Sequence, residues 1–220
     1  MSIPSLLDHV VIAGPDLPAL VDWFTERTGV VAAFGGAHPT GTANALVALT
    51  IGGARGPQYI ELIGPDPHRS QPELPETFGI ATLDAPRVQA YAVHPADIAA
   101  TVAAARERGF DPGDVSDLSR RTPDGTLLQW RLTRGENRRD VPFLIDWGTT
   151  AHPGLGDIPA IELVSFERVE ADPAPLRAVL EAYGLGDGAA EVVAGGPGAL
   201  GEDAGYRLTL RTASGELVRL

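Results

Sequence analysis

The stretch Leu6-Leu7-Asp8-His9-Val10-Val11-Ile12-Ala13-Gly14-Pro15-Asp16-Leu17 joins a buried strand directly to the start of a helix. Its apolar run, interrupted by one Asp-His pair, ends at Gly14-Pro15, and Asp16 is placed to cap the helix that follows. Apolar residues then recur with the spacing of one helix face, and Gly29 ends the pattern. We therefore expect a helix over Asp16–Thr28 that packs one face on a sheet.

The same plan occurs twice more along the chain. A second strand and helix lie within Pro86–Gly109, with the helix expected over Ala96–Arg108, and a third pair lies within Ile158–Gly184. After each helix come three short strand candidates separated by Gly, Pro and Asp. Three copies of a β-α-β-β-β unit are therefore predicted, over residues 6–64, 86–148 and 158–220. The alternative is a chance pattern of an ordinary α+β protein.

Composition excludes several classes of function. The 220 residues carry a formal net charge of −12 and contain no Lys, so a nucleic acid backbone would be repelled from most faces. The absence of Cys excludes disulfides, thiolate zinc sites and cysteine nucleophiles. No apolar stretch approaches the roughly 20 residues of a membrane-spanning helix, and no P-loop, dinucleotide-binding glycine motif or nucleophile elbow is present. We expect a cytoplasmic protein with neither a nucleic acid nor a membrane as partner.

Several motifs resemble the glyoxalase-like domain family of the vicinal oxygen chelate superfamily. They are the opening stretch, Gly36-Ala37-His38-Pro39 with Gly41-Thr42-Ala43-Asn44, Tyr59-Ile60-Glu61-Leu62-Ile63-Gly64-Pro65, Arg121-Thr122-Pro123-Asp124-Gly125, Leu128-Gln129-Trp130-Arg131-Leu132, and Pro142-Phe143-Leu144-Ile145-Asp146-Trp147-Gly148. The resemblance covers about residues 6–155. It implies an α+β fold in which repeated βαβββ modules form a cupped mixed sheet with helices on the outside.

Two domains are expected from this resemblance and the repeat. Residues 6–155 are expected to form a glyoxalase-like domain of two modules, and residues 156–220 a third module. An unpaired module needs a cover for its sheet. It is therefore expected either to pack on the first two modules or to pair with its copy in a homodimer.

The resemblance also implies a divalent metal ion held by one ligand on the first strand and one on the last strand of each module. His9 and Glu61 match these positions in the first module. Aligning the helix-ending glycines places Gln89 opposite His9, whereas a shift of one residue would place Ala90 there. Asp146 is the carboxylate of its strand that can stand opposite Glu61. Such ligands suit Zn, Mn, Fe, Co or Ni without choosing among them.

Each ligand candidate has a structural alternative. A lone His on an apolar strand is often a core residue. We therefore give equal weight to two roles for His9, a metal ligand and a buried core residue. Glu61 interrupts the apolar Tyr59–Ile63 stretch, and a carboxylate buried there needs a metal ion, an Arg or a proton. The resemblance also implies that Glu61 is the candidate catalytic group, because a ligating carboxylate in such a site can transfer protons.

Four further residues are candidates for substrate binding: His38, Asn44, Tyr59 and Arg131. The first two lie where a loop enters a strand, although turn formation explains them equally well. Tyr59 shares a strand side with Glu61. If its side of the strand faces the cup, Arg131 can pair with a substrate carboxylate, or equally with Glu61 or Asp146.

Trp147 is expected to point away from the cup, on the opposite side of its strand from Asp146. Three other histidines, each in or beside a Pro- or Gly-rich segment, are expected to be surface or capping residues: His68, His94 and His152.

The leading hypothesis from the sequence is a metal-dependent lyase, isomerase or dioxygenase-type enzyme acting on a small oxygenated molecule. The alternative is a metal-free protein of the same fold that binds a small molecule or sequesters a drug. A third hypothesis is an interaction protein built around the odd module.

Overall fold

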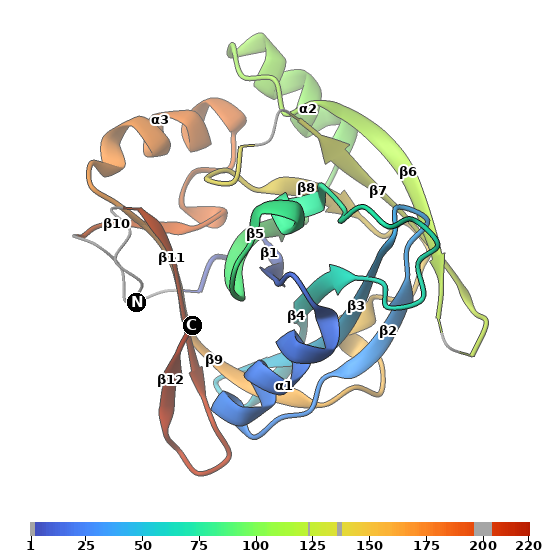
Figure 1. Ribbon diagram of the computed structural model, residues 1–220. Coiled ribbons are helices and arrows are strands. Elements are labelled where there is room, and N and C mark those ends of the chain that lie inside the picture. Colours follow the sequence, from blue (N-terminus) through green and yellow to red (C-terminus); the bar gives the residue numbers. More distant parts are fainter. Residues whose placement is uncertain (1–2, 123, 136–137, 196–203) are drawn as a thin grey trace.

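The computed structural model describes residues 3–122, 124–135, 138–195 and 204–220. In this part of the chain, twelve strands form one mixed sheet, and three α-helices lie outside it (Figure 1). The expected α+β cup with outer helices is therefore confirmed. The strands are β1 (Leu7–Ala13), β2 (Ala33–Ala37), β3 (Thr42–Ile51), β4 (Ala54–Pro65), β5 (Arg87–Val93), β6 (Asp114–Arg121), β7 (Leu127–Arg134), β8 (Phe143–Asp146), β9 (Ala160–Glu170), β10 (Glu191–Ala194), β11 (Gly205–Arg211) and β12 (Leu217–Arg219). The helices are α1 (Leu17–Thr28), α2 (Ile98–Glu107) and α3 (Pro173–Tyr183), and the short 3₁₀ helices are η1 (Thr77–Thr82), η2 (Pro153–Leu155) and η3 (Gly186–Gly188).

The three helices begin at aspartates whose carboxylates accept a hydrogen bond from the first turn. Asp16 caps α1 by accepting from the Ala19 N–H at 2.8 Å, and Asp97 and Asp172 cap α2 and α3 in the same way. Such a cap satisfies an amide that has no partner inside the helix. Gly29 then ends α1 in the left-handed conformation, at a φ of 73°. The start of α2 lies two residues beyond the expected Ala96, because Asp97 supplies the cap.

The first two modules have the same strand pairing. In each, the first strand lies parallel to the fourth, the fourth antiparallel to the third, and the third antiparallel to the second: β1-β4-β3-β2 and β5-β8-β7-β6. The antiparallel pair of β1 and β5 joins the two modules at the centre of the cup.

The third unit has the same order of elements but a different pairing. Its first strand, β9, lies parallel to both β3 and β10 and antiparallel to β11. The pairing of Ala160–Glu162 with Ala48–Thr50 joins it to the outer strand of the first module. The segment therefore extends the existing sheet instead of forming a separate cup.

The two faces of the sheet have different surroundings. The outer face and the three helices share one large apolar core, which includes Val10, Ile60, Phe24, Tyr91 and Phe166. The inner face lines the cup. A strand places successive side chains on opposite faces, so β1 alternates between core residues and cup residues.

The cup is closed where β2 meets β6 (Figure 1). The Arg120 guanidinium donates a hydrogen bond to the Gly35 carbonyl oxygen. A Cβ atom at Gly36, whose φ is 139°, would lie 2.5 Å from the carbonyl oxygen of Arg121. The Gly35-Gly36 pair therefore allows the two strands to approach closely.

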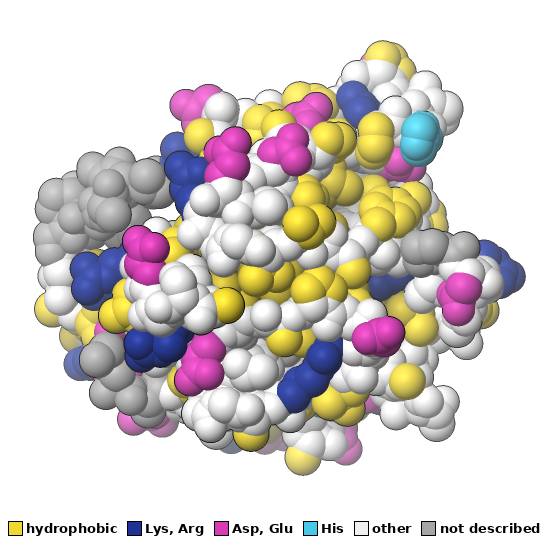
Figure 2. Space-filling model, turned by 90° about the horizontal axis from the view of Figure 1, so that it is seen from below, with side chains coloured by type: hydrophobic (Ala, Val, Ile, Leu, Met, Phe, Trp, Pro, Cys, Tyr) yellow, Lys and Arg dark blue, Asp and Glu magenta, His cyan; other side chains and the backbone are white. Residues whose placement is uncertain are grey.

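On the face seen in Figure 2, side chains of one charge do not form a patch, because acidic and Arg side chains are interspersed with apolar ones. No helix within the described residues is long and apolar enough to cross a membrane.

Candidate active site

A cavity of about 1120 Å³ occupies the inside of the cup. Its polar groups come mainly from the first module and from β6, with further arginines from α2, from the end of β7 and from the segment after β7, whereas β5 and β8 supply apolar side chains. The residues that line its central part include His9, His38, Thr42, Asn44, Tyr59, Glu61, Phe78, Ala90, Arg120, Trp130, Phe143, Ile145 and Trp147.

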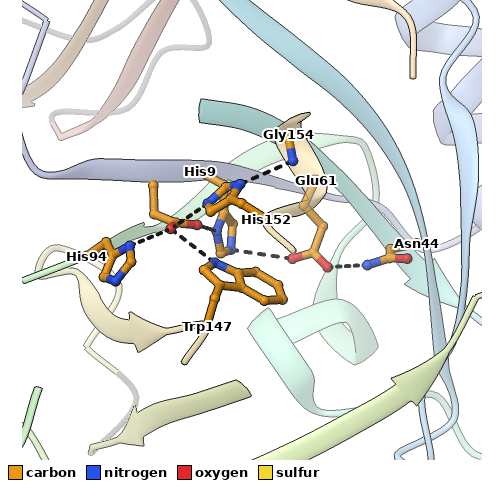
Figure 3. A network of polar contacts seen from close by, with 8 residues as sticks. His9, Asn44, Glu61, His94, Trp147, His152 and Gly154 are labelled. Atoms are coloured by element: carbon orange, nitrogen blue, oxygen red, sulfur yellow. Dashed lines mark hydrogen bonds and ion pairs between the residues drawn. The ribbon is translucent and has the colours of Figure 1, made fainter. Parts of the chain in front are cut away.

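Glu61 is the buried carboxylate of this cavity. It lies on β4 between the apolar Ile60 and Leu62 and is 8% exposed. Its Oε1 accepts a hydrogen bond from Asn44 Nδ2 at 2.6 Å, and its Oε2 lies 3.9 Å from His9 Nε2 (Figure 3). Strands β1 and β4 pair in parallel, which brings these residues together although they are far apart in the sequence.

Asp8 holds the other side of the His9 ring. Its Oδ1 lies 2.7 Å from His9 Nδ1, and both side chains are almost completely buried. The pairing of β1 with β5 shifts register between Leu7 and His9, so Asp8 sits at a β-bulge. A bulge re-aims a side chain that strict alternation would send to the opposite face. This local irregularity places Asp8 and His9 side by side.

Two more ring N–H groups bind the Asp8 carboxylate. Its Oδ2 accepts from Trp147 Nε1 at 3.1 Å and from His152 Nε2 at 2.9 Å (Figure 3). Burial acts to raise the pKa of Asp8, but the hydrogen bonds from His152 and His9 outweigh it and hold the pKa well below 3.8. Asp8 is therefore a permanent carboxylate, and His9 Nδ1 must carry the hydrogen that it accepts. This leaves Nε2 of His9 to face Glu61 and the cavity.

Tyr59 and His38 complete the surroundings of Glu61. The ring of Tyr59 stacks on His9 with centroids 4.6 Å apart, and burial raises its pKa well above 10. The phenol is thus a hydrogen-bond donor at neutral pH. Burial lowers the pKa of His38, with the Glu61 charge acting in the opposite direction, and its Nδ1 lies 2.9 Å from the Thr42 hydroxyl. Three residues proposed from the sequence for substrate binding, His38, Asn44 and Tyr59, therefore surround the carboxylate.

Arg120 brings a positive charge into the cup from β6. Its side chain lines the cavity and is 6% exposed, and Glu61 and Tyr59 act on it electrostatically. Its burial tends to lower its pKa, but an Arg remains charged under all physiological conditions.

The structure does not bring Gln89 and Asp146 to His9 and Glu61. Gln89 lies where β1 and β5 shift register, and its Oε1 accepts from Arg139 Nη1 at 3.1 Å. Asp146 forms an ion pair with Arg131. The cup-facing positions of β5 and β8 are instead taken by apolar residues, namely Ala90, Ala92, Phe143 and Ile145.

The donor set therefore does not fit the four-ligand metal site that the resemblance implies. His9 and Glu61 stand at two of the four positions, and the second module offers no nitrogen or oxygen ligand at the others. Within the described residues, no group of three or more His, Asp and Glu side chains is arranged to hold a metal ion. A cavity with two ligands and an apolar far wall differs from the usual three or four protein ligands of a bound transition metal.

Arg131 lies outside the cavity, and Trp147 faces the side opposite to the one expected. Arg131 pairs with Asp146 outside the cavity, which was one of the three partners that the sequence allowed. Asp146 and Trp147 do point to opposite sides of their segment, but Trp147 is the one that lines the cup. The inward side of β7 is its apolar side, carrying Trp130 and Leu132.

Sequence reasoning missed three polar residues of the site. Asp8 appears in the sequence only as part of an Asp-His pair inside an apolar run, and no motif in the sequence indicated a role for Arg120. His152 caps η2 as expected, by accepting from the Gly154 N–H, but its other nitrogen binds Asp8. His94, half-exposed, lies 3.7 Å from Asp8 at the surface, and His68 is exposed as expected.

Solved structures with a similar fold include a hypothetical protein from Staphylococcus aureus. It is 12% identical, the match covers 97% of each chain, and the TM-score is 0.60, which shows a shared overall fold. A variant of methylmalonyl-CoA epimerase from Streptomyces coelicolor is 23% identical over 66% of this chain and 97% of the epimerase, with a TM-score of 0.43. The epimerase from Mycobacterium tuberculosis is 20% identical over 66% of this chain and 90% of its own, with a TM-score of 0.38.

No curated protein matches the chain significantly. The model of one protein family, described as the glyoxalase-like domain, matches residues 7–184 and so covers both modules of the cup together with β9 and α3. The chain belongs to the glyoxalase-like domain family.

Proposed function

We propose that this protein is an enzyme of the isomerase or lyase type that moves a proton on a small oxygenated molecule held in the cup. One observation carries the proposal: Glu61 is buried beside His9 with no Arg partner within ion-pair distance among the described residues. Stability alone does not explain a carboxylate in such a place, because burying it costs free energy. The glyoxalase-like fold supports a small molecule as the substrate.

The proposed reaction begins with proton abstraction. Glu61 accepts a proton from a carbon atom next to a substrate carbonyl, and the electron pair of that C–H bond moves toward the carbonyl oxygen. His9 Nε2, when protonated, donates its hydrogen to that oxygen, so an enol forms without a net change in protons. When the reacting carbon carries a hydroxyl group, transfer of the proton from Glu61 to the former carbonyl carbon, with return of the hydrogen of that hydroxyl group to His9 Nε2, completes an isomerisation. Asp8 orients His9 throughout.

Hydrogen–deuterium exchange tests this proposal. In D₂O, wild-type protein should accelerate exchange of the protons next to the keto group of phenylpyruvate (2-oxo-3-phenylpropanoate) above the buffer rate, as followed by proton NMR. Glu61→Gln keeps the volume and the acceptor for Asn44 but removes the base, so the acceleration should fall by about 100-fold or more.

Glu167→Gln is the matched control. Glu167 is also a buried strand carboxylate, but it pairs with Arg207 away from the cup, so its change should leave exchange unaltered. Exchange that stays at the wild-type rate in Glu61→Gln would reject Glu61 as the base. A wild-type protein that does not accelerate the exchange would reject the proposed activity toward such ketones.

The same samples test the metal hypothesis. His9 and Glu61 alone are expected to hold less than one equivalent of Zn, Mn, Fe, Co or Ni after purification, measured by elemental analysis, and added metal should leave the melting temperature unchanged. Stoichiometric metal in the wild type that is lost in Glu61→Gln would instead support the metal-dependent enzyme.

The aromatic wall of the cup favours a second candidate function, a metal-free binding protein. Trp130 and Trp147 lie with ring centroids 5.6 Å apart, next to Phe143 and Tyr59, and such a wall can hold a flat apolar ligand without any reaction. Tight binding of phenylpyruvate without proton exchange would favour this function.

A further inference from the structure

We infer that Arg120 binds a carboxylate group of the substrate, so that the cup selects small carboxylic acids with an apolar or aromatic body. This inference rests on the proposed function and adds to it the class of substrate.

The guanidinium of Arg120 has no carboxylate partner of its own. It is 6% exposed, yet no Asp or Glu among the described residues lies within ion-pair distance of it. Buried charges in proteins are normally paired. An unpaired cation that lines a cavity is therefore suited to an anion that arrives from outside.

One guanidinium nitrogen of Arg120 has a hydrogen-bond partner among the described residues. Nη1 binds the Gly35 carbonyl oxygen, whereas Nε and Nη2 have no hydrogen-bond partner among the described residues and are not sealed from solvent. These two nitrogens therefore have access to the cavity that the side chain lines. A guanidinium presents its donors in a planar fork that matches the two oxygens of a carboxylate.

The backbone of β2 fixes the position of this group. Cβ atoms built at Gly35 and Gly36 would lie 3.3 Å from Arg120 Nη2 and 3.1 Å from Nη1, respectively. The guanidinium thus rests against two glycines and is held by one of their carbonyl oxygens. A positioned cation loses less freedom on binding than a mobile surface Arg.

The remaining walls suit the rest of such a substrate. Glu61 faces the same cavity as Arg120, and its negative charge would repel an acid whose carboxylate lay beside it. A substrate carboxylate therefore lies at Arg120 with the reacting carbon toward Glu61 and His9. The rings of Trp130, Phe143 and Trp147 contact the apolar body.

Calorimetric titration with three probes tests the inference: phenylpyruvate, its neutral methyl ester, and phenyl phosphate. Wild-type protein should bind the acid about 10- to 100-fold more tightly than the ester, the range for a charge-assisted hydrogen bond. Arg120→Gln should abolish this preference, and Arg120→Lys should keep part of it because the charge stays but the fork is lost.

Arg121→Gln is the control, since the neighbouring Arg121 is exposed and donates to the Gly125 carbonyl oxygen outside the cavity. It should keep the full preference. Equal binding of acid and ester by the wild type, binding of neither, or a preference that survives Arg120→Gln would each overturn the inference. Tighter binding of phenyl phosphate than of the acid would overturn the choice of a carboxylate. If circular dichroism shows that Arg120→Gln is unfolded, the acid-to-ester ratios of the wild type and Arg120→Lys decide.

The two proposals fail in different ways. Arg120-dependent binding of the acid without proton exchange leaves the substrate class standing and rejects the proton transfer. Glu61-dependent exchange of the ester as fast as that of the acid supports the proton transfer and rejects the role of Arg120.

Discussion

Asp8 shows how one side chain controls the geometry of the site. Its carboxylate is bound by the rings of His9, Trp147 and His152, which come from β1 and from the segment after β8. Charge-assisted hydrogen bonds of this kind are stronger than neutral ones and limit rotation of the rings. The direction of His9 Nε2 toward Glu61 therefore depends on a residue that does not itself line the cavity.

Replacing Asp8 should cost stability in a pH-dependent way. Asp8→Asn should lower the free energy of unfolding at pH 7 by about 3–5 kcal/mol, because it removes the charge from a buried hydrogen-bonded group. The pKa of Asp8 is held below 3.8 in the folded protein. Its contribution is thus complete above pH 3.8 and is lost as the pH falls through the lower folded pKa. Urea unfolding at several pH values measures the difference between wild type and variant.

Asp16→Asn is the control, because it removes the same charge at an exposed N-cap where Asn serves equally well. It should change stability by less than about 0.5 kcal/mol at pH 7. A gap between wild type and Asp8→Asn that stays constant from pH 7 to about pH 3 would show that the ionisation of Asp8 is not its source.

At the scale of elements, a register shift decides which residues face the cup. The bulges in the pairing of β1 with β5 bring Asp8 beside His9 and direct Gln89 to Arg139. Strict alternation from the helix-ending glycines cannot anticipate an extra residue in a strand. The second pair of expected metal ligands was displaced for this reason.

The closure of the cup by β2 and β6 predicts a special sensitivity at Gly36. Gly36→Ala should destabilise the protein by about 1–3 kcal/mol more than Gly52→Ala, since the added Cβ would press on the Arg121 carbonyl oxygen. Gly52 also has a positive φ, of 58°, but nothing lies within 4 Å of its Cβ position. Urea unfolding measures both variants. Equal costs would mean that the close approach of the two strands does not contribute to stability.

At the scale of the whole molecule, the C-terminal segment shares the core of the two modules. Phe166 on β9 is fully buried, and its ring lies 5.2 Å from that of Tyr91 on β5. The apolar cluster runs without interruption from α1 through both modules to α3 and β11. The segment therefore covers the first two modules, as one of the two sequence expectations had it, while a homodimer and a cytoplasmic location stay predictions.

This shared core predicts cooperative unfolding. Phe166→Ala should lower the free energy of unfolding by about 3–5 kcal/mol. Tryptophan fluorescence, which reports on Trp130 and Trp147 in the cup and on Trp23 in α1, should still change together with the far-UV circular dichroism signal. In urea unfolding, the circular dichroism signal of the variant could change at a lower urea concentration while the midpoint of the tryptophan fluorescence change stays at its wild-type value. That result would show that residues 158–220 form an independent unit.

The sequence by itself determined the repeated β-α-β-β-β order, the presence of the three helices and the pair His9 and Glu61. These features are local: Asp caps, left-handed glycines and apolar periodicity act within a few residues, and the motif around each residue of the pair is contiguous. The same motifs predicted Tyr59 and Asn44, which lie next to Glu61, as candidates for substrate binding.

The tertiary structure alone decided which groups join that pair. Arg120 enters the cup because β6 meets β2, and His152 reaches Asp8 from a loop far along the chain. The pairing of β9 with β3, and the bulges that turn Gln89 away, are likewise set by strand register. Register depends on the packing of whole faces against one another, which a window of neighbouring residues does not contain.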